Sequence, residues 1–88
     1  MPRWEVCRIK EISREEKGRK YGVFTRYVAV LDTIQGEQML DQSEEAERTQ
    51  EALAEPHSKL VGRLLADGWE PLTTDVVGKV IAFRRQVP

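Results

Sequence analysis

The sequence predicts an α+β domain, namely a three- or four-stranded antiparallel sheet with one amphipathic helix packed on one face. Several segments of the 88-residue chain are rich in β-branched and aromatic residues, and polar, glycine-containing stretches separate them. One further segment carries apolar residues at helical spacing and ends at a glycine. A chain of this length has room for one thin core, so residues 1–88 are expected to form a single domain.

The first two strands are predicted at residues 4–12 and 23–34. The second is nearly continuously apolar over residues 27–31, which is typical of a central strand with both faces covered. The charged segment 13–22 between them has the composition of a connection, and the two strands are expected to pair antiparallel. Gly36 is expected to end the second strand.

The acidic segment 37–54 has few apolar residues. Ser43, followed by Glu44 and Glu45, is typical of a helix start with a capping hydroxyl and acids in the first turn. The segment has little to bury, so the sequence predicts either a weakly packed helix or an excursion over the surface. The order of elements is therefore strand, strand, (helix), helix, strand, strand.

The better helix is predicted over residues 55–67, with Pro56 in its first turn. Gly68 follows it and is expected to stop it, because glycine takes the left-handed conformation at little cost. Its apolar stripe consists of Leu60, Val61, Leu64 and Leu65. The stripe is expected to contact Tyr27, Leu31, Trp69, Ile81 and Phe83, or else the residues of opposite parity on the second strand.

Two short strands are predicted after the helix, at residues 69–74 and 76–85. Pro71 restricts the first to an edge of the sheet or to a strand with an unpaired position, because proline has no backbone N–H to donate. In the second, Val77, Ile81 and Phe83 are expected on one face, and Val80 and Ala82 on the other.

The net charge is −1, which does not favour a general attraction to nucleic acid or to an anionic membrane. The charge is unevenly distributed. Residues 1–30 carry eight Lys and Arg against four acids, whereas residues 31–55 carry one Arg against eight acids. No segment has the length or apolarity of a signal peptide or a membrane span, so a bacterial cytoplasmic protein with no membrane association is expected.

The residues that could carry chemistry are few, and no enzyme, metal or cofactor is expected. His57 has no neighbouring nucleophile or orienting acid and is predicted to be a partly exposed helix-start residue. Cys7 is the only cysteine, which excludes an intramolecular disulfide, and in a strand it is expected to act as a small buried hydrophobe. Glu44, Glu47, Glu51 and Glu55 would share one helix face, but without histidines they are expected to be solvated rather than to bind metal.

One basic patch could contact a nucleic acid. Arg14, Lys17, Arg19 and Lys20 lie beside Tyr21, and basic residues with an aromatic neighbour can bind phosphates and stack on bases. Arg84 and Arg85 would extend this patch if the last strand ended nearby. Glu15 and Glu16 lie in the same segment and reduce its charge.

Trp4 and Trp69 each precede a glutamate and are expected to be core or core-rim residues. The Trp4-Glu5 opening, the Leu64 to Glu70 centre with its Gly68-Trp69-Glu70 sequence, and the Phe83-Arg84-Arg85 close resemble small bacterial domains of unknown function. That resemblance implies the fold and an architectural role for Gly68, Trp69, Glu70 and Trp4, and it implies no activity.

A non-enzymatic binding or assembly module, which self-associates as a homodimer through a sheet face or edge, is therefore the expected function. One helix covers one face of a sheet, and Val28, Val30, Val80 and Ala82 predict that the other face is apolar and needs a partner. The alternatives are a nucleic-acid-binding accessory domain that uses the 14–20 segment with Arg84 and Arg85, and a small enzyme that uses His57. Another protein could also serve as the partner.

Overall fold

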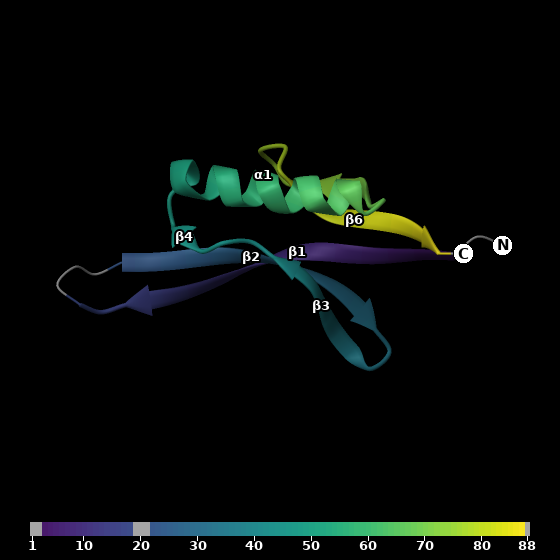
Figure 1. Cartoon of the computed structure of the whole chain (residues 1–88), viewed down its shortest axis with the longest axis horizontal. Coiled ribbons are helices and arrows are strands. Elements are labelled where there is room, and N and C mark those ends of the chain that lie inside the picture. The colour runs from purple at the N-terminus through teal and green to yellow at the C-terminus, as the bar shows by residue number, and fades with distance from the viewer. Residues whose placement is uncertain (1–2, 19–21, 88) are drawn as a thin grey trace.

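In the computed structural model, which describes residues 3–18 and 22–87, one helix lies along one face of an antiparallel sheet (Figure 1). The α+β class and the single helix layer are thus as predicted. The sheet has six strands rather than three or four, and five of them follow the order β3-β2-β1-β6-β5, with β4 paired to β2. The elements are β1 (Arg3–Glu16), β2 (Gly22–Thr33), β3 (Gly36–Gln42), β4 (Ala46–Glu47), α1 (Gln50–Ala66), β5 (Glu70–Thr74) and β6 (Val80–Val87).

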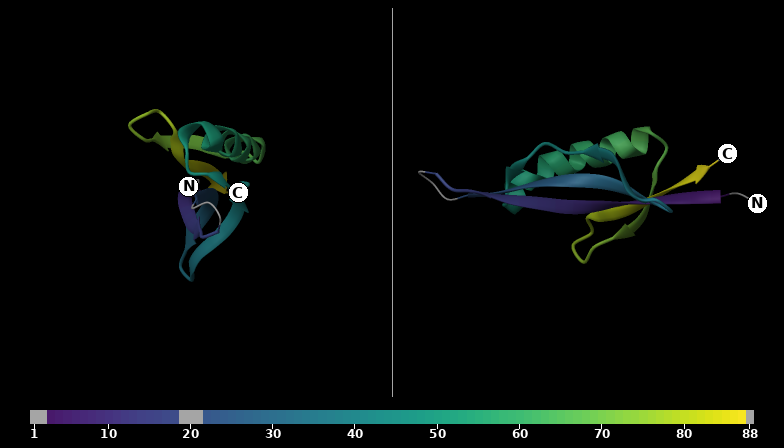
Figure 2. Two further views of the ribbon diagram at one scale, coloured as in Figure 1. Left: turned by 90° about the vertical axis from the view of Figure 1, so that its left-hand side faces the viewer. Right: turned by 90° about the horizontal axis from the view of Figure 1, so that it is seen from below.

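The two longest strands, β1 and β2, form a hairpin whose ladder runs from Cys7 opposite Leu31 to Glu16 opposite Gly22. Residues 13–16 and 22 of the predicted connection 13–22 are therefore strand. Polar cross-strand pairs support it: the Ser13 and Thr25 hydroxyl oxygens lie 2.7 Å apart. The hairpin extends past the N-terminal end of α1, and the molecule is correspondingly elongated, with dimensions of 57 × 29 × 22 Å (Figure 2).

Gly36 does not end the sheet at this point but begins β3. It has a φ of 117°, which glycine adopts readily, and the turn is closed by the Thr33 hydroxyl, which donates to the Gly36 carbonyl at 2.6 Å. The chain then pairs back along β2, with Met39 opposite Val30. This strand was missed because an edge strand with one exposed face and few apolar residues has a weak sequence signal.

The acidic segment 37–54 is mostly strand and coil, and its predicted helix start at Ser43 is wrong. The Ser43 backbone N–H donates to the Tyr27 carbonyl and the Ser43 hydroxyl accepts from the Tyr27 N–H, both at 2.8 Å, so Ser43 remains bound to β2. The helix begins at Gln50, capped by the Thr49 hydroxyl, which accepts from the Ala52 N–H at 3.1 Å.

Because α1 starts earlier than predicted, its buried face is shifted and Pro56 lies inside the helix. The buried residues are Leu53, His57, Leu60 and Leu64, at spacings of four, three and four, while Leu65 is 47% exposed. They pack on a core that also contains Cys7, Tyr27, Ala29, Trp69 and Phe83.

The last two strands form a hairpin in which β5 is an edge strand, as Pro71 predicts. The final strand begins at Val80 rather than residue 76, and Val77 lies in the turn, 76% exposed. The β5–β6 ladder shifts register between Thr73 and Thr74, and Val80 packs against the helix-side core instead of the opposite face.

Candidate functional site

A hollow of about 600 Å³ lies where the β5–β6 turn faces the first half of α1 and the middle of the β1–β2 hairpin. The ladder between β6 and β1 ends at Arg8, so the edge of β1 beyond that point has no neighbouring strand in the described ladders. The hollow, called the Lys79 hollow below, is lined by Glu11, Tyr27, Gln50, Leu53, Ala54, Asp75, Val77, Gly78 and Lys79.

Three side chains from separate elements meet at one end of the Lys79 hollow. The Lys79 ammonium donates to the Tyr27 hydroxyl at 2.5 Å and lies 4.6 Å from the centre of the Tyr27 ring. The His57 ring meets the Tyr27 ring edge-on, with 5.1 Å between ring centres. Tyr27 and Lys79 are 52 residues apart in the chain, which is why no sequence motif marks this cluster.

Two acids lie beside this cluster. Glu11 is directly opposite Tyr27 in the β1–β2 ladder, so the two side chains are on the same face. One carboxylate oxygen of Asp75 accepts the backbone N–H groups of Val77 and Lys79, at 3.0 and 2.9 Å, so this carboxylate is engaged in holding the turn.

His57 is buried, 8% exposed, in the interior of α1, and the prediction of a partly exposed helix-start residue is wrong. Its Nε2 lies 3.2 Å from the Val80 carbonyl oxygen, so Nε2 carries the proton and donates. Burial lowers the pKa of His57 below its ordinary value of 6.5, and the nearby Lys79 charge lowers it further. His57 is therefore a neutral core residue that supports Tyr27.

Cys7 is fully buried in the core, as its strand context predicts. Burial raises the pKa of its thiol to about 11, against a smaller opposing effect of Arg85. A thiol with this pKa is almost entirely protonated at neutral pH and is a poor nucleophile.

The predicted basic patch is not assembled from its two parts. Arg84 pairs with Val6 in the β1–β6 ladder, roughly 26 Å along β1 from Arg14 at the usual rise per residue. Arg14 binds Glu45, Arg84 binds Glu70 and Arg85 binds Glu5, and these charges are neutralised within the chain. Lys17 is exposed, and Arg19, Lys20 and Tyr21 lie outside the described residues.

The Gly68-Trp69-Glu70 segment ends the helix and returns the chain to the sheet, as predicted. Gly68 has a φ of 90°, and the Gly68 and Trp69 N–H groups donate to the Leu65 and Leu64 carbonyls. Trp69 is 3% exposed. Trp4 does not join it in the core: it is 45% exposed, and the Arg84 guanidinium lies over its ring, 4.4 Å from the ring centre.

The sheet face opposite α1, called the open face below, is covered differently from the prediction. Val28 and Val30 are buried, 4% and 6% exposed, although they were expected to lie uncovered on this face. Arg8 and Lys10 on β1 both bind Glu37 on β3, at 2.8 and 3.0 Å, and these ion pairs must cross β2 and its two valines. The apolar side chains that stay accessible on this face are Trp4, Val6, Ile12 and Met39, between 40% and 57% exposed.

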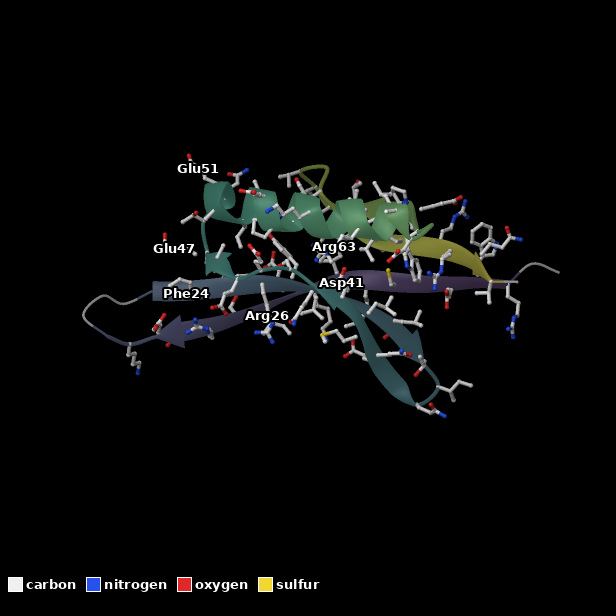
Figure 3. All side chains as sticks on the ribbon, viewed as in Figure 1. Phe24, Arg26, Asp41, Glu47, Glu51 and Arg63 are labelled. Carbon is white, nitrogen blue, oxygen red and sulfur yellow. The ribbon has the colours of Figure 1, made fainter. Side chains whose placement is uncertain are left out.

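A second polar cluster joins α1 to the end of β3. The Arg63 guanidinium donates to the Asp41 carboxylate at 2.8 Å and to the Gln42 carbonyl at 2.8 Å, and the two labelled side chains lie side by side in Figure 3. This hydrogen bond from Arg63 lowers the pKa of Asp41. The cluster fixes the sheet edge to the helix.

The predicted acidic stripe is not formed, because Glu44 and Glu47 precede the helix while Glu51 and Glu55 belong to it. Within the described residues, no group of His, Cys, Asp and Glu side chains is arranged to hold a metal ion. Within the same residues, no helix has both the length and the apolarity needed to cross a membrane. Comparisons with protein-family models, with curated proteins and with solved structures gave no match.

Proposed function

We propose that this chain is a non-enzymatic assembly module that forms a homodimer through the open face of its sheet. The observation that carries the proposal is the exposure of Trp4 and Val6, 45% and 44%, on the face that α1 does not cover. They lie in one strand on the same side, and Arg84 stacks on Trp4. Tryptophan and arginine are the residues most enriched where protein interfaces gain their affinity.

The charge of the open face favours a second copy as its partner over a polyanion. Arg8, Lys10 and Arg84 on this face are ion-paired with Asp32, Glu37 and Glu70. Three bases thus meet three acids, so most of the charge on this face, apart from Arg26 opposite Ile12, is paired within the chain. This pairing weakens both the attraction to nucleic acid and the repulsion between identical faces.

The size of the open face reaches the lower bound of what a dimer needs. Four strands at about 4.8 Å spacing and about eight to eleven residues of strand at about 3.3 Å each give roughly 500–700 Å² per copy. A standard specific interface buries about 800 Å² on each partner, and about 1,000 Å² in total is the lower bound for a stable one.

Native mass spectrometry across a concentration series, up to several hundred micromolar, tests the proposal. We expect a homodimer without additional mass. Val6→Lys places an unpaired charge in the interface and should raise the dissociation constant at least about tenfold. The matched control is Val76→Lys, since Val76 is also exposed but lies in the β5–β6 turn.

Two results would overturn the homodimer. One is a monomer throughout the series, and the other is a monomer that carries a co-purified nucleic-acid fragment or a different protein. A dimer that Val6→Lys leaves intact would place the interface elsewhere and equally refute the open face.

A further inference from the structure

We propose that the Lys79 hollow binds a small zwitterion of the amino-acid class, with the ligand carboxylate on Lys79 and the ligand ammonium on Glu11. The hollow is on the helix side of the sheet, so the proposal does not depend on dimerisation through the open face. It rests on the charges at the hollow, on the fixed position of the Lys79 ammonium and on the apolar residues of the lining.

Lys79 supplies the positive end of the site. Among residues 3–18 and 22–87, no carboxylate forms an ion pair with Lys79, whereas Arg8, Arg14, Arg63, Arg84 and Arg85 all have one. Its ammonium donates one hydrogen to the Tyr27 hydroxyl and is held over the Tyr27 ring, which leaves two hydrogens for a ligand. Tyr27 is 2% exposed and therefore acts as a rigid positioning residue.

Glu11 supplies the negative end. It lines the hollow from β1, opposite Tyr27, and no described base forms an ion pair with it. Asp75 also lines the hollow, but its carboxylate is engaged by the Val77 and Lys79 backbone N–H groups. Lys79 is thus the one base among the lining residues, and Glu11 is the acid there whose carboxylate accepts no backbone hydrogen bond. This arrangement suits a zwitterion better than a simple anion, because Glu11 and Asp75 would repel the anion.

Apart from Gln50, the rest of the lining is apolar, and the hollow is of suitable size. Leu53 and Ala54 from α1 and Val77 from the turn line it. Val77 is 76% exposed, so an apolar ligand side chain would remove apolar surface from water. A volume of about 600 Å³ lies within the range of small-molecule sites.

Titrations that follow the backbone amide resonances test the site with L-leucine and L-phenylalanine as probes. Isocaproate and isopentylamine are the controls for leucine, since each keeps the branched side chain and lacks one of the two charges. We expect a saturable shift of the Leu53, Ala54 and Gly78 resonances with at least one amino acid. Both leucine controls should bind at least about tenfold more weakly than leucine.

Two variants assign the charges to their residues. Lys79→Met keeps the length of the side chain, and Glu11→Gln keeps its shape, and each should weaken amino-acid binding at least about tenfold. Lys59→Met and Glu15→Gln are matched controls, because both residues are exposed and neither lines the hollow. If the Lys79→Met variant does not fold, Glu11→Gln still tests the site, because Glu11 is exposed and its substitution should leave the fold intact.

The proposal is overturned if neither amino acid produces a saturable shift at millimolar concentration. It is also overturned if isocaproate binds as tightly as leucine, or if Glu11→Gln leaves the affinity unchanged. If the Val6→Lys variant still binds the amino acid, the hollow and the open face are separate sites. If the variant folds but no longer binds it, amino-acid binding depends on the open face and the proposal of a separate site is wrong.

Discussion

The Arg85 guanidinium lies over the indole ring of Trp69, 4.4 Å from the ring centre, and also donates to the Glu5 carboxylate at 2.6 and 2.9 Å. One side chain thus connects Trp69, which lies just beyond the end of α1, with strands β1 and β6. The contact depends on the sharp return of the chain at Gly68, since a helix that continued past Asp67 would carry Trp69 away from the sheet. The helix stop is therefore a determinant of the fold.

Gly68→Ala should destabilise the protein by about 1–2 kcal/mol. The φ of 90° at Gly68 disfavours any residue with a Cβ, although the added Cβ would meet the Arg85 Cδ at an ordinary 3.9 Å. Gly62→Ala is the matched control, because Gly62 lies in the exposed interior of α1 with open space around it. That change should instead stabilise by about 0.5–1 kcal/mol. Urea denaturation measures both, and the same sign for both would contradict the explanation.

Stability should fall as the pH decreases through about 6.5, the ordinary pKa of histidine, because of His57. The pKa of His57 is lowered in the folded protein, so the unfolded chain takes up its proton first as the pH decreases. Stability is therefore lost as the pH falls through the ordinary value of 6.5, and the loss levels off below the folded pKa. His57→Gln should remove this slope from urea-denaturation curves taken across the range.

The control for His57 is Ser58→His in the wild-type background, since Ser58 is exposed on α1. An exposed histidine has similar pKa values in both states and should leave the slope unchanged. Equal slopes for the wild type and His57→Gln would refute the role of the buried ring.

A second loss of stability is expected at lower pH from the carboxylates that bind arginine. Hydrogen bonds from Arg8, Arg14 and Arg63 lower the pKa values of Asp32, Glu45 and Asp41, respectively. Their contribution is complete above the unfolded-state pKa values and is lost as the pH falls through the lowered ones. Asp41→Asn should remove part of this acid transition without changing the slope that His57 causes, which denaturation series of the two variants can separate.

Arg63→Met should destabilise by roughly 0.5–1 kcal/mol, because it removes hydrogen bonds to Asp41 and Gln42 that attach α1 to β3. Lys59→Met, which removes an exposed pair with Glu55 in the same helix, should cost less than about 0.5 kcal/mol. Added salt should reduce the difference between the two variants. An equal effect of both substitutions on the urea midpoint would argue against a tertiary role for Arg63.

Cys7 should react very slowly with Ellman's reagent in the folded protein at about pH 8, because it is buried and its thiol pKa is about 11. Unfolding in guanidinium should release one thiol equivalent at once. Ser58→Cys is the control, since a second, exposed thiol should react rapidly without denaturant. Rapid reaction of the wild-type thiol in native buffer would show that β1 is not closed by β6 at this position.

The parts of the fold that the sequence predicts well are those with local causes. The apolar run of β2, the glycine stop at Gly68 and the proline-marked edge strand β5 each depend on residues adjacent in the chain. The start of α1 was misplaced because Thr49 as a cap and Leu53 as a core residue carry a weaker local signal than the leucines that follow.

The candidate sites could not be read from the sequence because their residues are distant in the chain. Tyr27, His57 and Lys79 come from β2, α1 and the β5–β6 turn. The cover of Val28 and Val30 by Arg8 and Lys10 likewise needs the strand order, since Glu37 becomes a partner only when β3 lies beside β2.

The sequence by itself thus determined the fold class, the helix stop with its buried tryptophan and the edge position of β5, because backbone conformation at glycine and proline and apolar periodicity act over a few residues. Only the tertiary structure decided which face each apolar residue occupies, which charges remain available and where a hollow forms. Those properties follow from strand register and from where the β6 ladder ends, and both are set by long-range pairing rather than by local preference.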